Sequence, residues 1–590
     1  MKARPFLAAV LAAAVLLFGL GIGGWWLLLQ RSPLALQQHT LSLPLAARFV
    51  PRSVPLSLHW LVSADEPAAY LRAVARPAER RRAAAAAERL RDGVFATAGL
   101  DYVSELAPWL GEEISLALLT PPTPDQPPGW VLALRSRNPE GARRFLQRFW
   151  QTRSLAGTDL HITSYRGMGL ISGRGALVGQ QAQPIATALI NDDLVLIASG
   201  RGALEQALDV SQIDDLNQAG SPQLQQAVRR LGKGVVLLTA RSGALGGWLG
   251  LPDPGAGLAP APGAAPGAAP GPGAGEAAVE ELVLALAPAG RGLELAGLLQ
   301  LGQPLPLTPL RDGESLLAQI ALPASSLALV QNPAALLAAD SPWRPLATSL
   351  LALALPPSAG PLPALVAGAD GGALLGARSN QGWLLGSRQD QPDPALLAAP
   401  LAQAGYAPAP LLLNQRPLLV WSQLLSKPVK GNPDQLQARL AGARAQGPMT
   451  GSDTGSETGP GTGLGPGSEL AWWAEGLAVL ETQLEGRHPP KERLQQLALL
   501  QSPQAPLQWA MDGATTRSLL AAWQPWRLLV ALSGADGSLA ERVRGAAFSL
   551  EADPGVDGAG PDPGTADLGG SASASRDKLL RLRGQLQFQG

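Results

Sequence analysis

Two segments far apart in the chain share a pattern that constrains the fold more than any other feature. Residues 293–301 read LELAGLLQL, and residues 580–588, at the C-terminal end, read LRLRGQLQF. The two align without a gap, and in both the apolar residues alternate with other residues, which is typical of a half-buried strand. A chain that repeats a strand in this way is expected to contain two copies of one fold.

Further pairs of similar segments precede these two strands in a common order. The strand at 280–287 is similar to 545–552, and the strand and helix at 235–249 are similar to 507–523. Residues 193–208 match 476–497 more loosely, and 50–58 resemble 322–330. Any one pair would be weak in a chain rich in leucine and alanine, but their common order indicates a duplication. We therefore expect two tandem homologous domains, at about 46–302 and 314–590.

The local pattern within the first copy mixes α and β. Residues 129–136 are strand-like, and the Asn-Pro-Glu sequence at 138–140 then provides an N-cap, a proline in the first turn and an acidic residue for a helix start. Residues 160–172 and 187–199 have the pattern of hairpins. Strands joined by short turns predict a mainly antiparallel sheet with covering helices, which is an α+β fold and not a doubly wound nucleotide-binding fold.

The N-terminus contains an uncharged run at residues 5–29, PFLAAVLAAAVLLFGLGIGGWWLLL. As a helix this run would be about 37 Å long, enough to cross a hydrocarbon core of about 30 Å. Lys2 and Arg4 precede it and predict a cytoplasmic N-terminus, while Trp25 and Trp26 would lie at the far headgroup region. No A-x-A cleavage site follows, so an uncleaved signal-anchor is expected, with the bulk of the chain exported to the periplasm or thylakoid lumen.

Three segments rich in Gly, Pro and Ala are expected to be disordered, because they lack the apolar side chains that would offset the entropy lost on ordering. They are 252–275 in the first domain, and 446–468 and 553–575 in the second. The predicted architecture is therefore a transmembrane helix at 1–31 followed by two tandem duplicated α+β domains that these segments interrupt.

Composition excludes several classes of function. The 590 residues include 46 Lys and Arg against 46 Asp and Glu, and this zero net charge gives no basis for nucleic-acid binding. The absence of cysteine excludes disulfides, thiolate metal sites, cysteine nucleophiles and an acylated lipoprotein cysteine. The four histidines, His39, His59, His161 and His488, are not spaced as metal ligands, so no metal or cofactor is expected.

One short segment matches the catalytic motif of a known class of peptidases. Residues 451–463 read GSDTGSETGPGTG, in which Asp453-Thr454-Gly455-Ser456 matches the catalytic loop of pepsin-like aspartic peptidases. Those enzymes use two carboxylates, each positioned by a buried strand, whereas Asp453 has a polar, glycine-rich flank and no second Asp-Thr-Gly exists. The sequence also lacks a G-x-S-x-G elbow and a Walker loop. No catalytic residue is therefore expected, and Asp453 is interpreted as part of a solvated loop.

Four short motifs carry a family resemblance. They are Phe49-Val50-Pro51, Gly-Leu-Asp at 99–101, Pro-Trp-Leu-Gly at 108–111 and VLALRSRNPEGARRFL at 131–146. In these the chain resembles uncharacterised N-terminally membrane-anchored proteins, common in cyanobacteria, that carry a domain of unknown function. The resemblance covers most of the predicted exported region, and it implies an anchored protein but no activity and no catalytic residues.

These observations favour a non-enzymatic, single-pass membrane-anchored envelope protein that binds or scaffolds another component on the non-cytoplasmic side. Its expected partners are the membrane, through the N-terminal helix, and an unidentified protein or lipid. Two alternatives stay open: a carrier or chaperone for lipid or polypeptide, and a hydrolase with an unrecognised site.

Overall fold

The computed structural model describes residues 32–589, apart from segments within that range. The omitted residues are 98, 121–127, 156–158, 176–182, 248–278, 306, 312, 340, 342, 345–346, 349–350, 352–358, 428–434, 448–469, 487–490, 533–537 and 554–577. The predicted linker at 252–275 lies wholly outside the described residues, and those at 446–468 and 553–575 lie almost wholly outside them.

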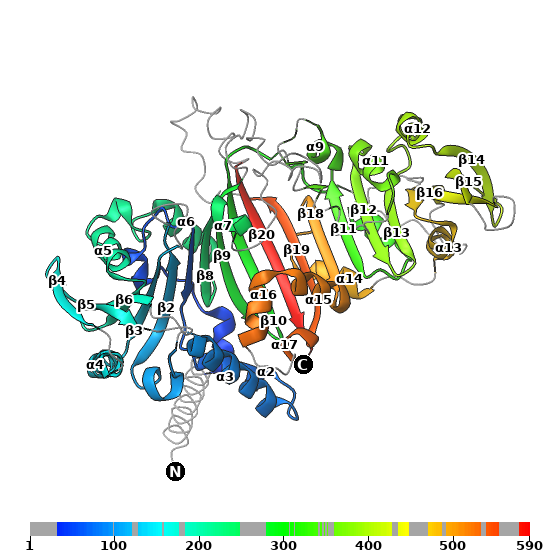
Figure 1. Ribbon diagram of the computed structural model, residues 1–590. Coiled ribbons are helices and arrows are strands. Elements are labelled where there is room, and N and C mark those ends of the chain that lie inside the picture. Colours follow the sequence, from blue (N-terminus) through cyan, green and yellow to red (C-terminus); the bar gives the residue numbers. More distant parts are fainter. Residues whose placement is uncertain are drawn as a thin grey trace, which may run out of the picture.

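Within the residues that the structure describes, twenty strands form one antiparallel sheet (Figure 1). From the outer edge inward, the first half contains β4 (His161–Tyr165), β5 (Met168–Gly175), β6 (Gln183–Ile190), β7 (Leu194–Ala198), β3 (Trp130–Ser136), β2 (Leu110–Leu118), β1 (Leu56–Trp60), β8 (Val236–Arg241), β9 (Val279–Ala289) and β10 (Gly292–Leu301).

The second half repeats this order from the opposite edge. It contains β14 (Ala407–Leu413), β15 (Arg416–Lys427), β16 (Gln435–Gly447), β17 (Leu470–Ala474), β13 (Gly382–Arg388), β12 (Ala373–Ser379), β11 (Ser326–Gln331), β18 (Leu507–Asp512), β19 (Val543–Ala552) and β20 (Leu579–Phe588). Each strand of the first half thus occupies the same place as the strand numbered ten higher in the second.

The halves join where β10 pairs with β20, which places Leu295 opposite Gly584 and Gly297 opposite Leu582. These are the two segments whose similarity the sequence shows. In separate domains each would be an edge strand with unpaired backbone N–H and C=O groups, and here those groups pair with each other. The prediction of two separate tandem domains is therefore wrong, because both halves belong to one sheet, whereas the prediction of antiparallel pairing is confirmed.

Packing across this junction is also continuous. One hydrophobic cluster combines Ala240 and Leu282 from the first half with Leu336 and Trp509 from the second. In addition, Arg230 Nη1 lies 2.5 Å from Asp553 Oδ2, and both side chains are largely buried. The junction is thus a core of the molecule and not a hinge between two units.

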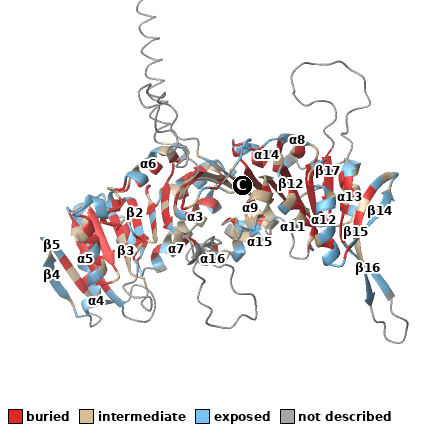
Figure 2. Cartoon of the chain, turned by 90° about the horizontal axis from the view of Figure 1, so that it is seen from above, coloured by how far each residue is buried: buried red, intermediate tan, exposed pale blue. Residues whose placement is uncertain are grey.

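Helices cover both halves of the sheet (Figures 1 and 2). In the first half they are η1 (Pro33–Gln38), η2 (Leu45–Phe49), α2 (Glu66–Val74), α3 (Arg80–Thr97), η3 (Tyr102–Leu106), α4 (Pro139–Leu155), α5 (Arg201–Val210), η4 (Asp214–Leu216), α6 (Pro222–Leu231) and α7 (Ser242–Gly247). In the second half they are α8 (Gly313–Ala318), α9 (Pro333–Leu337), α11 (Leu362–Ala369), α12 (Pro394–Gln403), α13 (Leu477–Glu485), α14 (Lys491–Leu499), α15 (Gly513–Ala522), α16 (Gln524–Leu532) and α17 (Ser538–Glu541).

Local sequence signals account for several of these elements. Asn138 caps α4, since its Oδ1 accepts the Gly141 N–H at 3.2 Å. The hairpins β4–β5 and β6–β7 turn at residues with positive φ, among them Arg166 and Asn191, as their sequences predict. The match of 193–208 with 476–497 also predicts a strand at 476–481, and this is wrong: β17 ends at Ala474 and α13 begins at Leu477.

The predicted transmembrane helix gains no support. Its residues, 5–29, lie outside the described part of the chain. Within the described part, no helix has both the length and the apolar character needed to cross a bilayer.

Candidate functional site

A cluster of buried polar side chains lies on one face of β1, β2 and β8. Side-chain alternation puts Ser57 and His59 on the same face of β1, and the register places Ser115 opposite His59 and Thr239 opposite Ser57. All members of this polar cluster are at most 5% exposed: Ser57, His59, Glu113, Ser115, Gln218 and Thr239. Because buried polar groups must find partners, their contacts form a connected network.

His59 lies at the centre of the polar cluster. Its Nδ1 is 2.8 Å from Ser115 Oγ, and its Nε2 is 3.1 Å from Ser57 Oγ, which in turn is 2.7 Å from Thr239 Oγ1. A proton assigned to Nδ1 satisfies these contacts, since His59 then donates to Ser115 and accepts from Ser57. Burial lowers the pKa of His59, and a hydrogen bond with Gln218 raises it by a smaller amount, so that the pKa is about 4. The ring is therefore neutral at pH 7.

Glu113 ends this network. Its Oε2 accepts the Leu45 N–H at 2.9 Å and its Oε1 accepts the Ala46 N–H at 2.7 Å, while the Ser115 hydroxyl donates to Oε1 at 3.4 Å. The two N–H groups belong to the first turn of η2, where backbone donors have no partner within the helix. Glu113 therefore fastens η2 to the sheet.

The pair Ser57 and His59 resembles a nucleophile beside a general base. Both side chains have zero exposure, however, and a substrate cannot reach Ser57 Oγ in this structure. The polar cluster therefore supports a structural role.

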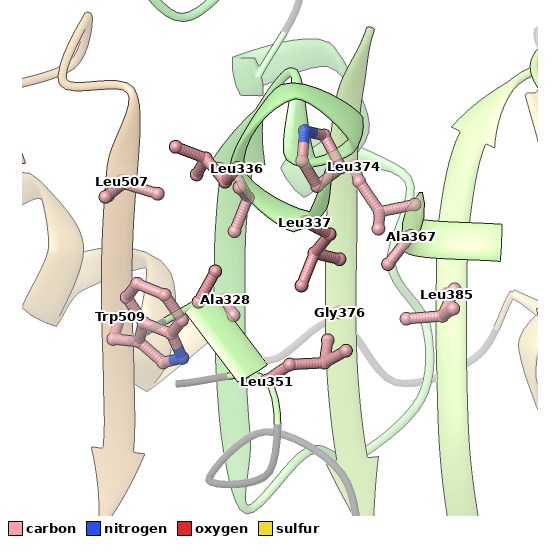
Figure 3. A pocket seen from close by; sticks show the side chains of 13 residues that line it. Ala328, Leu336, Leu337, Leu351, Ala367, Leu374, Gly376, Leu385, Leu507 and Trp509 are labelled. Carbon is pink, nitrogen blue, oxygen red and sulfur yellow. The ribbon is translucent and has the colours of Figure 1, made fainter. Parts of the chain in front are cut away.

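An apolar pocket lies over the second half of the sheet, where α9 and α11 face β11, β12, β13 and β18 (Figure 3). It encloses about 50 Å³. Its lining residues are Ala328, Val330, Pro333, Leu336, Leu337, Ala347, Leu351, Ala367, Leu374, Gly376, Leu385, Leu507 and Trp509. We call it the Gly376 pocket.

Glycine at position 376 helps to create this space. The register places Gly376 of β12 opposite Ala328 of β11 on one side and Leu385 of β13 on the other. A Cβ added at Gly376 would lie 3.7 Å from Leu385 Cδ2 and 3.8 Å from the Ala328 Cβ, in ordinary contact. The Cβ of a larger side chain at position 376 would therefore fit, and the rest of that side chain would extend into the pocket.

Trp509 supplies the one polar side-chain atom among the lining residues. Its ring stacks on Phe548 with centroids 5.3 Å apart, and the side chain is buried. Its Nε1 has no hydrogen-bond partner among the residues that the structure describes. Figure 3 shows the nitrogen on the edge of the ring that faces the other labelled lining side chains. The pocket thus combines an apolar wall with one free N–H donor.

The site residues predicted from the sequence lie where the structure does not test them. Lys2, Arg4, Trp25, Trp26 and Asp453 all lie outside the described residues. The aspartic-peptidase motif falls in the connection between β16 and β17, whose counterpart in the first half is the short turn between β6 and β7.

The structure also places two of the histidines and Asp512. His39 Nδ1 contacts the Gly234 carbonyl oxygen at 3.0 Å, and His161 is exposed on β4. Asp512, whose sequence Asp-Gly-Ala-Thr does not provide a second peptidase motif, caps α15 by accepting the Thr515 N–H at 2.7 Å.

The fold and the pocket define a protein built on one duplicated antiparallel sheet that offers a small apolar cavity. Residues 10–349 match the DUF3352 family, described as a protein of unknown function. This match spans more than half of the chain, and the chain therefore belongs to that family.

No curated protein matches the chain. Among solved structures, crystal form I of TP0453 is similar at 10% identity and a TM-score of 0.25, covering 44% of this chain and 80% of that one. Crystal form IV gives 9% identity and a TM-score of 0.24, covering 43% and 79%. Similarity at this level assigns neither fold nor function.

Proposed function

We propose that the chain is a non-enzymatic binding protein that holds the end of an apolar, lipid-type chain in the Gly376 pocket. The observation that carries the proposal is the chemistry of the lining, in which twelve of the thirteen residues have no polar side-chain atom. Contact with such a wall favours alkyl groups, at about 0.8 kcal/mol for each buried CH₂.

The size of the pocket limits what it encloses. Pockets for whole small-molecule ligands measure roughly 300–1,000 Å³, and an engineered apolar cavity of about 150 Å³ holds one benzene. The Gly376 pocket, at about 50 Å³, matches the last few carbons of a chain. We therefore propose capture of a chain end, and not enclosure of a complete lipid.

The free N–H of Trp509 adds a polar preference. A buried donor without a partner costs about 1–3 kcal/mol, and a ligand oxygen that accepts from it would recover part of that cost. The acceptor should be neutral, as in an ester or ketone, because burying a charge without a counter-charge is far more costly. A ligand with an alkyl chain and one carbonyl oxygen fits both features.

Replacing Gly376 by valine is expected to weaken binding of the probe 2-octanone at least ten-fold, because the new methyl groups extend into the space that the ligand needs. Isothermal titration calorimetry measures the affinity, and circular dichroism verifies that the variant is folded. Gly169→Val is the matched control, since it adds the same side chain on exposed β5 where nothing lies within 4 Å of the new Cβ. Absence of binding by the parent chain, or equal binding by both variants, would contradict the proposal.

A further inference from the structure

Strands β15 and β16 extend beyond the rest of the sheet. They contain 12 and 13 residues, whereas their counterparts β5 and β6 contain 8 each. Pairing with β14 reaches only to Ser422 of β15, and pairing with β17 begins only at Ala443 of β16. Residues 423–427 and 435–439, which we call the arm, therefore pair only with each other within the described part of the sheet, and Figure 2 shows β16 reaching away from the body of the molecule.

The arm exposes leucines on both of its faces. Register places Leu424 opposite Ala438, and Leu436 opposite Ser426 on the same face, and these leucines are 68% and 72% exposed. Leu425 points to the other face and is 39% exposed. A packed protein element would cover one face of such a hairpin and leave the other in water. Lipid can surround both faces at once.

Charge on the arm favours an anionic surface. The two strand segments of the arm contain Lys427 and Arg439 and no acidic residue. Arg439 is exposed, on the face opposite to Leu424. Basic residues beside exposed leucines are the combination that binds an anionic lipid interface, where each cation near the surface adds attraction.

We propose that the arm inserts its leucines shallowly into the surface of an anionic lipid layer. Depth is restricted by the backbone, because a two-stranded arm has unpaired N–H and C=O groups along its outer edges and these are costly in hydrocarbon. The arm therefore reaches the boundary between headgroups and acyl chains, about 5–10 Å deep.

A second copy of the chain is the less favoured occupant. Stable protein interfaces bury roughly 1,200–2,000 Å² in total, and two arms packed face to face would contribute only a few leucines each while leaving Leu425 exposed. Neither feature suits a stable dimer.

The absence of cysteine in the chain allows a local test with the full-length protein. A polarity-sensitive dye is attached to Leu436→Cys and, as a control, to Leu155→Cys, whose leucine is 90% exposed at the end of α4. Vesicles of equal parts phosphatidylglycerol and phosphatidylcholine are expected to shift the emission at position 436 to the blue and to leave position 155 unchanged. An unchanged emission at position 436 in the presence of vesicles would overturn the proposal. A blue shift that appears without vesicles when the protein concentration is raised would also overturn it, and would indicate that the arm binds a second copy of the chain.

Affinity provides a second, independent readout. The double variant Leu424→Gln/Leu436→Gln is expected to bind these vesicles at least ten-fold more weakly in co-sedimentation. Leu155→Gln/Leu396→Gln, which removes two leucines elsewhere that are 90% and 65% exposed, is expected to bind within two-fold of the parent. Equal loss in both double variants, or in neither, would also overturn the proposal.

Discussion

Replacing Glu113 by alanine is expected to destabilise the protein by about 3–6 kcal/mol, since two hydrogen bonds to a charged acceptor are lost, at about 1.5–3 kcal/mol each. The Leu45 and Ala46 N–H groups would lose their partner, and the Ser115 hydroxyl would lose an acceptor. η2 would keep its apolar contacts, among them those of Ala46 and Phe49, and the hydrogen bond that the Ala219 N–H donates to the Ala47 carbonyl oxygen.

Urea unfolding followed by circular dichroism measures this effect. The neighbouring residue provides a matched control, because Glu112 points to the opposite face of β2 and is exposed. Glu112→Ala is expected to change stability by no more than about 0.5 kcal/mol. Equal effects of the two substitutions would show that Glu113 does not fasten η2.

Acidification is expected to destabilise the protein through His59, and the loss is confined to a defined pH range. Burial lowers the pKa of His59 from 6.5 to about 4, so between these values the unfolded chain binds a proton that the folded chain does not. The stabilising contribution is present above pH 6.5 and is lost as the pH falls toward 4. Its full size corresponds to about 3 kcal/mol.

The measurement compares the parent with His59→Gln in urea titrations at pH 7, 6, 5 and 4. The variant has no group that ionises at this position, so its stability should fall less across the range. Burial raises the pKa of Asp370 to about 6, which contributes with the opposite sign, but both proteins carry Asp370 and the difference between them cancels it. A pH dependence as steep in His59→Gln as in the parent would contradict the assignment, and the exposed His161→Gln should behave as the parent does.

Much of the local structure follows from the sequence. Alternation and turn residues predict β3, the start of α4 and both hairpins of the outer first half, because these depend on neighbours in the chain. The similarity between 293–301 and 580–588 identifies equivalent strands. It does not tell whether each remains a free edge or pairs with the other, since that depends on contacts between distant segments. The prediction of two separate domains is wrong because the sequence does not show that β10 pairs with β20.

The sites are harder to predict, for two different reasons. In β1 and β2 the polar residues Ser57, His59, Glu113 and Ser115 alternate with apolar ones, which is also the pattern of a strand with a solvent-facing side. This face of β1 and β2 is buried only because other segments, among them η2 and the segment that contains Gln218, cover it. A buried face accounts for the pattern equally well, and no residue in these strands distinguishes the two.

The Gly376 pocket depends on residues from six elements of the second half, separated by most of its length. Ala328 and Trp509 become neighbours of Gly376 only through the order β18, β11, β12 in the sheet. Glycine within the apolar strand at 373–379 is the one local signal, because a missing side chain in a buried strand marks either close packing or a space.

The most direct test of the proposed function is to locate a ligand in the crystal. Crystals of the chain soaked with 1-bromohexane, examined at the bromine absorption edge, report the position of the alkyl chain through anomalous scattering. We expect a bromine peak between α9, α11 and β12, close to Gly376 and Trp509, and we expect this peak to disappear in Gly376→Val. Crystals that show no bromine in the Gly376 pocket, or show it only elsewhere, would contradict the proposal that this pocket binds alkyl chains.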